Sequence, residues 1–164
     1  MKTIISKVEP NELQACLEVI HRSFKTVAED FCLTPENCPR HTSFLPLVFL
    51  ETQMNWGWHM YILRLHHEII GYMSLSSEDN GFYELHHLCI LPEYRHEGYG
   101  KMLLDFAKQT VRSFGGTGIQ IGIIEESEIL KKWYQKNGFV STGTRKFDHL
   151  PFTSGYLKWE GDLK

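Results

Sequence analysis

The sequence predicts an α/β domain whose sheet contains strands of mixed direction. Two features indicate this: an antiparallel meander in the middle of the chain, and helices that alternate with short strand-like runs around it. The 164 residues are 42% hydrophobic and 23% charged, which is ordinary for a globular protein. A chain of this length buries most of its surface in one core, so we expect residues 1–164 to form a single domain.

The first third of the chain is predicted to hold one strand and two helices. Residues 4–8 form a short apolar run, and Asn11 followed by Gln14 resembles a capping box at the start of a helix. Residues 30–46 contain three prolines and are expected to be loop. Residues 47–55 are mostly apolar and predict a second helix.

The next stretch changes to strand periodicity. Residues 59–65 and 69–76 are two β-rich runs that flank a short polar turn. The pair Asn80-Gly81 is a strong signal for a tight turn, and a third strand follows over residues 83–90. Three consecutive strands joined by tight turns predict an antiparallel meander.

Helices and strands alternate again in the last third of the chain. Residues 100–114 carry apolar side chains at helical spacing, and residues 119–124 form a β-rich run. A short helix is predicted over residues 127–136, followed by two strands at about 139–146 and 155–160. This element order predicts that the sheet mixes parallel and antiparallel neighbours.

Composition and charge exclude several classes of function. The net charge of −3 argues against nucleic acid as the main ligand, because no strong positive field attracts phosphate chains. An apolar run of about 18 residues, as a membrane helix needs, is missing, and the first residues lack a signal-peptide pattern. The four cysteines show no C-x-x-C spacing, so we expect reduced thiols in a cytoplasmic protein.

A metal site is not expected, although the chain contains nine histidines. His66-His67 and His86-His87 are pairs of adjacent residues, and the side chains of adjacent residues diverge on strands. A His-x-x-x-His helix and clusters of His and Cys are missing from the sequence.

The stretch that carries most chemical information ends in the loop Arg95-His96-Glu97-Gly98-Tyr99-Gly100. It follows an apolar strand closed by Pro92 and leads directly into an amphipathic helix. Gly98 and Gly100 allow the backbone to approach a ligand closely. The free N–H groups of the first helical turn and the helix dipole then form an anion site, which suits a diphosphate.

Two other glycine-rich phosphate loops fit this stretch less well. A P-loop requires glycine at the position of Arg95 and Ser or Thr at the position of Met102. The dinucleotide fingerprint requires a small residue at Leu103 and an early β-α-β unit, whereas this loop follows three predicted antiparallel strands. Both alternatives therefore fail on residues and on context.

The loop resembles motif A of the GCN5-related N-acetyltransferase (GNAT) superfamily, an apolar strand and Pro followed by [QR]-x-x-G-x-[GA]. The segment from Tyr134 to Phe139 is similar to the family's later motif, a helix ending in Tyr-x-x-x-Gly-Phe. The resemblance covers nearly the whole chain. It implies the GNAT fold: a central, mixed, mostly antiparallel sheet of about seven strands with about four helices packed on both faces.

The resemblance also implies acetyl-CoA as co-substrate and transfer of its acetyl group to an amine of a small molecule or peptide by direct attack. It assigns donor contacts to the end of the strand before Pro92, to the loop and to the later motif. These residues are Leu88, Cys89, Ile90, Arg95, His96, Glu97, Gly98, Tyr99, Gly100, Lys101, Ser127 and Tyr134. Ser127 departs from the Asn that many members carry, and Cys89 is interpreted as a packed strand residue rather than a nucleophile.

Three residues are candidates for proton transfer. By resemblance, Tyr134 donates to the departing CoA thiolate and Glu84 is the base that deprotonates the amine through water. His86 is the alternative base, because an unperturbed imidazole has the better pKa for that task. Strand alternation predicts Glu84, His86, Leu88 and Ile90 on one face and His87 on the other.

The resemblance also implies that the acceptor binds between the early helices and the final strands, so residues 38–44 and 147–152 are the candidate segments around it. Candidate side chains around it are Trp56, Trp58 and Phe152 as an apolar wall, and Asp148 and Glu51 as attractants for a cation. The sequence does not identify the amine. A catalytically silent acyl-CoA-binding module stays as the alternative function, and a homodimer through exposed edge strands stays open.

Overall fold

A computed structural model describes residues 2–161, which fold into one seven-stranded sheet and four α-helices. The strands are β1 (Thr3–Lys7), β2 (His59–Leu65), β3 (Glu68–Ser77), β4 (Phe82–Ile90), β5 (Gly118–Ile124), β6 (Val140–Lys146) and β7 (Thr153–Glu160). The helices are α1 (Leu13–Asp30), α2 (Leu47–Asn55), α3 (Tyr99–Ser113) and α4 (Glu128–Lys136). The strand order is β1-β2-β3-β4-β5-β7-β6, and only the β4–β5 pair among them is parallel. The predicted mixed, mostly antiparallel sheet is confirmed.

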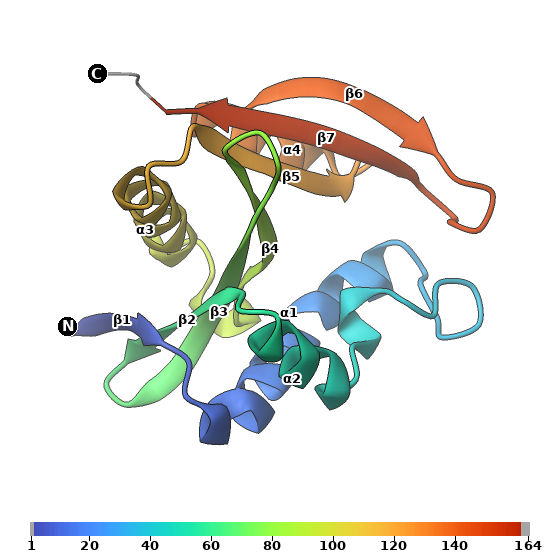
Figure 1. Ribbon diagram of the computed structural model, residues 1–164. Helices are drawn as coiled ribbons and strands as arrows, with labels where there is room; N and C mark the ends of the chain where they lie inside the picture. Colours follow the sequence, from blue (N-terminus) through green and yellow to red (C-terminus); the bar gives the residue numbers. More distant parts are fainter. Residues whose placement is uncertain (1, 162–164) are drawn as a thin grey trace.

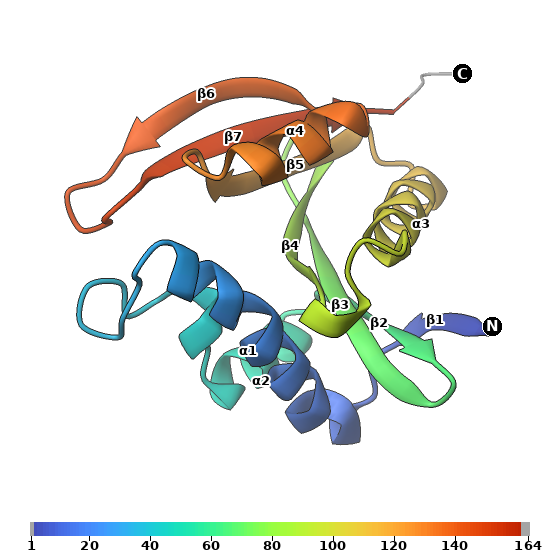
Figure 2. The ribbon, with the colours of Figure 1, turned by 180° about the vertical axis from the view of Figure 1, so that it is seen from behind.

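The helices cover both faces of the sheet (Figures 1 and 2). Helices α1 and α2 lie on one face, where Ile20 and Leu50 are fully buried. Helix α3 lies on the other face and buries Leu103. Helix α4 lies beside the start of α3. The Trp133 ring of α4 is 3.5 Å from the position that a Cβ atom on Gly100 of α3 would occupy. Burial of apolar side chains between the layers accounts for this arrangement.

The start of α1 differs from the sequence prediction. Asn11 is not the helix cap: a 3-10 turn, Pro10–Glu12, precedes the helix, and Glu9 caps that turn. The Glu9 N–H donates to the Glu12 carboxylate at 2.8 Å, and the Glu9 side chain accepts from the Glu12 backbone. Pro10 is well placed as the first residue of the turn, because its missing N–H has no helical partner to lose.

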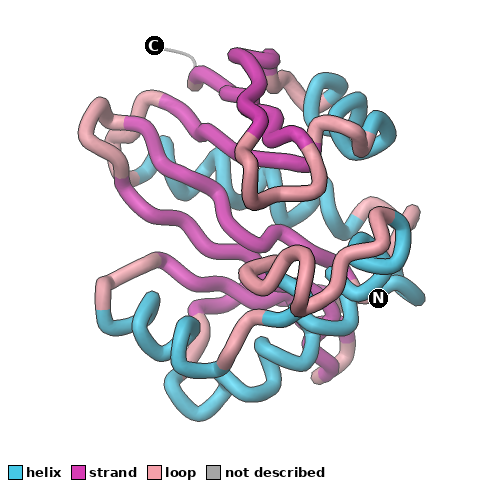
Figure 3. The backbone as a smooth tube through the Cα atoms, turned by 90° about the vertical axis from the view of Figure 1, so that its right-hand side faces the viewer, coloured by secondary structure: helices cyan, strands magenta, loops and turns pink. Residues whose placement is uncertain are grey.

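Strand β4 is the seam between two halves of the sheet, and Figure 1 shows it running from the β1–β3 half to the β5–β7 half. Figure 3 shows the strands of the sheet in magenta from another side. The β4–β5 pairing covers only Phe82–Gly118, Tyr83–Ile119 and Glu84–Gln120. Beyond Glu84, no strand in the described part of the chain pairs with that edge of β4. The sheet therefore has a gap in its middle.

A β-bulge in β4 changes which face its side chains take. The register with β3 shifts between Tyr72 and Ser74, and His87 adopts a left-handed φ of 56°. Before the bulge, His86 faces the α1/α2 side. After it, the Ile90 side chain faces α3, since both Ile90 Cδ1 and Leu103 Cδ1 crowd the Cβ position of Gly71. The predicted single face for Glu84, His86, Leu88 and Ile90 is therefore wrong.

A second, smaller cluster joins the two halves at one end of the gap. Ala28, Leu33 and Cys38, from α1 and the loop after it, pack with Ile124 at the end of β5 and with Phe152 before β7. This cluster holds the β6–β7 loop against the end of α1. None of the helices described is long and apolar enough to cross a membrane.

Candidate active site

A cavity of about 400 Å³ opens where β4 and β5 part. It passes through the sheet, so that groups from both helical layers line it. The lining residues are Phe24, Val27, His41, Thr42, Glu84, Leu85, His86, His87, Leu88, Ile121, Gly122, Ile123, Ile124, Ser127, Leu130, Tyr134, Leu150, Phe152, Ser154 and Tyr156.

The loop before α3 has the geometry of an anion cradle. His96 and Gly98 have positive φ values of 67° and 88°, and Gly98 is the N-cap of α3. The first helical bond runs from the Met102 N–H to the Gly98 carbonyl, 3.1 Å, so the N–H groups of residues 99–101 have no acceptor within the helix. A Cβ at Gly98 would meet nothing within 4 Å, so the space above the loop is open. These features fit the diphosphate of CoA.

The Arg95 side chain turns inward and away from this cradle. Its Nε donates to the Ile90 carbonyl at 3.1 Å, and its two terminal nitrogens donate to Thr26 Oγ1 at 2.9 Å and to the Ser23 carbonyl at 2.6 Å. The fixed fork of a guanidinium suits such a three-way contact. Arg95 therefore fastens the loop to β4 and α1, and what faces the open space is backbone.

The end of β4 presents backbone groups to the gap. The Leu91 N–H donates to the Ile70 carbonyl of β3 at 2.9 Å. Because antiparallel bonding alternates along a strand, the amides of Leu88 and Ile90 point away from β3 and toward the gap. Cys89 between them is buried, and burial raises the pKa of its thiol to about 12, so the thiol stays protonated.

Glu84 and His86 meet on the α1/α2 side of the gap. His86 Nε2 lies 2.7 Å from Ser76 Oγ and 3.5 Å from Glu84 Oε2, and its ring stacks on Trp58 at 4.1 Å. Burial, with a smaller contribution from the charge of Glu78, raises the pKa of the half-buried Glu84 carboxyl. The structure thus puts the two candidate bases in contact.

The histidines of the cavity are held in their neutral form. Burial lowers the pKa of His86 to about 3, with His87 adding to the effect, and lowers the pKa of His87 to about 4. Burial also lowers the pKa of His41. The bulge turns His87 to the same side as His86, with its Nδ1 3.4 Å from Thr42 Oγ1, which corrects the prediction that His87 points to the opposite face.

Tyr134 reaches the cavity from α4, on the side opposite Glu84. Burial raises the pKa of its phenol well above the usual range. The turn at Gly138, with φ of 92°, returns the chain so that the Phe139 N–H donates to the Tyr134 carbonyl at 3.0 Å. The Phe139 ring then packs edge-on against Tyr134 at 5.2 Å. The spacing Tyr-x-x-x-Gly-Phe therefore fixes the tyrosine ring.

The remaining predicted donor residues are placed less distinctively. Ser127 lines the cavity as the N-cap of α4 but makes no capping bond with its side chain. Lys101 pairs with Asp105 at 2.7 Å on the exposed face of α3. Lys131 of α4 pairs with Glu125.

The acceptor side agrees with the sequence prediction only in part. His41 and Thr42 come from the expected segment 38–44, and Phe152 from the expected segment 147–152, and all three line the cavity. The Trp58 ring stacks on the His86 ring. Trp56 is 68% exposed, and neither it nor Glu51 or Asp148 belongs to the lining.

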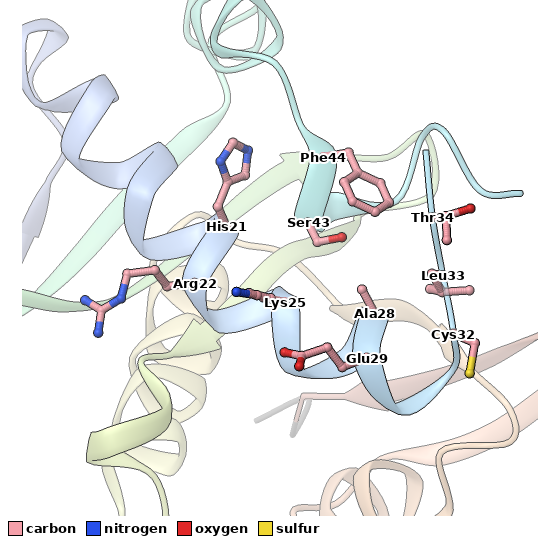
Figure 4. A pocket seen from close by; sticks show the side chains of 10 residues that line it. All are labelled: His21, Arg22, Lys25, Ala28, Glu29, Cys32, Leu33, Thr34, Ser43 and Phe44. Atoms are coloured by element: carbon pink, nitrogen blue, oxygen red, sulfur yellow. The ribbon is translucent and has the colours of Figure 1, made fainter. Parts of the chain in front are cut away.

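Two lining residues of α1, Phe24 and Val27, were not predicted for the site. Helical spacing marks apolar residues of α1 but does not distinguish those that face the core from those that face a cavity. A second hollow, of about 510 Å³, lies along α1 (Figure 4). Its lining comes from α1 and from residues 32–34 and 43–44, without any residue of β4 or β5, so it is separate from the gap.

Residues 2–161 contain no group of three or more His, Cys, Asp or Glu side chains arranged to hold a metal ion. Glu84, Tyr134 and the free edge of β4 are the chemically distinctive parts of the cavity, and the loop before α3 lies at the end of the same strand.

Comparison with known proteins agrees with this geometry. An uncharacterised N-acetyltransferase of Lactobacillus delbrueckii subsp. lactis is 28% identical over 102 residues, which cover 57% of this chain and 56% of that protein. The chain thus matches about half the length of this relative. The crystal structure of the ribosomal-protein-S18-alanine N-acetyltransferase from Escherichia coli has a TM-score of 0.80 at 12% identity, covering 99% of this chain and 96% of that chain.

A third protein, an acetyltransferase from Bacillus anthracis, was crystallised in complex with acetyl coenzyme A. It is 27% identical, with a TM-score of 0.60, over 64% of this chain and 63% of that chain. The profile of the acetyltransferase (GNAT) domain family matches residues 56–141, which include β4, the loop and Tyr134. From fold, motifs and this match together, the chain belongs to the GNAT acetyltransferase family.

Proposed function

We propose that this protein transfers the acetyl group of acetyl-CoA to a primary amine by direct attack in a ternary complex. One observation carries the proposal: a single cavity through the sheet is lined by Glu84 from one side and by Tyr134 from the other. The anion cradle before α3 lies at the end of the same strand, β4. Donor and acceptor can therefore meet at the gap, and alignment alone accounts for a large part of such a rate enhancement.

The donor side is assigned mainly to backbone groups. The N–H groups of residues 99–101 suit the diphosphate, and the free edge of β4 suits the amide groups of the pantetheine arm. The Leu88 N–H is our candidate donor to the thioester carbonyl, where negative charge develops during attack. The acetyl-CoA complex of the Bacillus anthracis acetyltransferase supports the choice of donor.

We assign the base to Glu84 rather than to His86. A base works best when its pKa lies near the operating pH, and burial raises the pKa of Glu84 toward that range. Burial lowers the pKa of His86 to about 3, which makes it a weak proton acceptor. His86 is then a positioning residue that holds the Glu84 carboxylate through the 3.5 Å contact.

Tyr134 is assigned as the acid. Because its pKa is raised, the phenol is protonated at neutral pH and holds a proton for the leaving sulfur. The amine nitrogen forms the new bond to the acetyl carbon, and the carbon–sulfur bond breaks with its electron pair on sulfur. One ammonium proton leaves through Glu84 before attack, and the second replaces the proton that Tyr134 gives to the thiolate.

A silent acyl-CoA-binding module is the alternative function. Such a module has no need of titratable groups around the thioester, whereas here Glu84 and Tyr134 line one cavity from opposite sides. This arrangement favours the enzyme. A single domain over residues 1–164, a cytoplasmic location, the lack of a nucleic-acid partner and a homodimer through an edge strand such as the fully exposed β6 stay predictions.

Thiol release from acetyl-CoA in the presence of a panel of primary amines tests the proposal, with acetyl-CoA binding measured separately by calorimetry. We expect binding and amine-dependent thiol release. Binding without release on any amine would establish the silent module instead, and absence of binding would refute the donor assignment.

A further inference from the structure

The acceptor half of the cavity is largely apolar and is built by three segments far apart in sequence. Its wall consists of Phe24 and Val27 of α1, His41 and Thr42 after the proline-rich loop, and Leu150 and Phe152 before β7. We call these six residues the acceptor wall. The second core cluster, which joins α1 to the β6–β7 loop, backs this wall at one end.

Among the described residues that line the cavity, Glu84 is the only Asp, Glu, Lys or Arg. An ammonium group that enters the cavity therefore has one carboxylate to approach. A second ammonium on the same molecule would be taken out of water without an anionic partner, which is unfavourable. The lining thus favours a singly charged amine.

The cavity also has no cation for a carboxylate or a phosphate. Lys and Arg are missing from its lining, and His41, His86 and His87 are kept neutral by burial. A carboxylate next to the amino group would lie close to Glu84 and be repelled by it. The cavity lining therefore disfavours free amino acids as acceptors, although it accepts the apolar substituent of an amine.

The available space limits the size of the acceptor. The volume of about 400 Å³ must hold the acetyl-bearing end of the pantetheine arm as well as the amine. The rings of Phe24 and Phe152 offer flat contact surfaces in the remaining space, and buried aromatic contact favours an aromatic or branched apolar substituent. A long or branched polar substrate does not match these walls.

We propose that the acceptor is a small primary monoamine with an apolar, preferably aromatic, substituent and no acidic group. This inference rests on the proposed acetyl transfer and specifies its second substrate. The chemistry of the acceptor wall, one carboxylate among otherwise uncharged and largely apolar groups, carries it.

Matched acceptors test the inference, because they differ by one charged group. Phenethylamine and phenylalanine share a ring and an amino group, and only phenylalanine has a carboxylate. We expect kcat/KM for phenethylamine to exceed that for phenylalanine by at least about 100-fold. Putrescine, with two ammonium groups, and a tripeptide that begins with phenylalanine are expected to fall at least about 10-fold below phenethylamine.

Wall variants supply a second readout. Phe152→Ala is expected to raise KM for phenethylamine about 10-fold while acetyl-CoA binding stays unchanged. Phe147→Ala is the matched control. Phe147 is an aromatic residue of the same β6–β7 loop, but its side chain does not line the cavity. Thr42→Arg places a cation on the wall and is expected to narrow the gap between phenethylamine and phenylalanine.

The outcomes separate the two proposals. If phenylalanine, putrescine or the tripeptide is acetylated as well as or better than phenethylamine, the acceptor class is wrong while acetyl transfer stands. If no amine in the panel releases thiol although acetyl-CoA binds, acetyl transfer itself is refuted.

Discussion

The two sides of the central cavity are built in different ways. The donor side consists of backbone: the helix-start N–H groups after Gly98 and the unpaired edge of β4. The acceptor side consists of side chains: Glu84 of β4 and residues from α1, from positions 41 and 42 and from the β6–β7 loop. The bulge at His87 lies between them: His86 and His87 face the α1/α2 side, whereas the Ile90 side chain after the bulge faces α3.

This difference explains how one fold can keep acetyl-CoA as its donor substrate while its acceptor substrate changes. Backbone groups persist when most side chains change, so the donor side depends on a few residues that shape the chain, such as Gly98 and Arg95. On the acceptor side, in contrast, the shape and polarity of the cavity change with every substitution in the acceptor wall. Variants that disturb one side and leave the other intact therefore test the division directly.

The largest effect is expected on the acceptor side from Glu84→Gln. Loss of the base should lower kcat about 100- to 10,000-fold while acetyl-CoA binding is unchanged. Steady-state thiol release and calorimetry measure the two quantities. A variant with kcat within about threefold of wild type would show that Glu84 is not the base.

Glu78→Gln is the control for that variant. Glu78 lies outside the cavity lining, and its charge contributes to the raised pKa of Glu84. Its removal should keep the plateau of kcat/KM and move the acidic limb of the pH profile to lower pH, because Glu84 then loses its proton more readily.

On the donor side, Gly98→Val should weaken acetyl-CoA binding about 100-fold, the equivalent of losing one or two hydrogen bonds to a charged group. A β-branched residue strains the positive φ of 88° and moves the amides that follow. Gly115→Val is matched, since Gly115 has a φ of 75° and an equally open Cβ position at the other end of α3. Equal losses of affinity in both variants would contradict the anion cradle.

Tyr134→Phe should lower kcat about 10- to 100-fold, because one hydrogen bond to a developing thiolate is lost. The phenyl ring keeps its packing on Phe139, so stability should change little. Tyr61→Phe, at another buried tyrosine outside the cavity lining, is expected to keep full kcat. If Tyr134→Phe retains wild-type kcat across the pH range, the acid is another group or water.

A change of stability with pH is expected from the two buried histidines. The pKa of His86 falls to about 3 and that of His87 to about 4 from 6.5, so the unfolded chain binds more protons between these values. The free energy of unfolding should therefore decrease as pH falls from about 6.5 to about 4, by up to about 1.4 kcal/mol per pH unit for each histidine. Urea unfolding of wild type and of His87→Asn should show a shallower decrease in the variant, and parallel curves would contradict neutral burial.

The donor side was largely predictable from the sequence, since a loop with Gly98 and Gly100 before an amphipathic helix is a local pattern. So was the order of strands and helices. The bulge was not, because His86-His87 looks like any strand pair and nothing local indicates that β4 gains a residue against β3. Phe24 and Val27 were missed for a related reason: the contact of α1 with the cavity depends on tertiary packing.

Hydrogen exchange of single backbone amides, followed by NMR with and without CoA, tests the division between the two sides most directly. We expect CoA to slow exchange at Leu88, at Ile90 and at residues 99–101, and to leave β6 unchanged. Binding of CoA with unchanged exchange at all of these amides would contradict a donor site made of backbone.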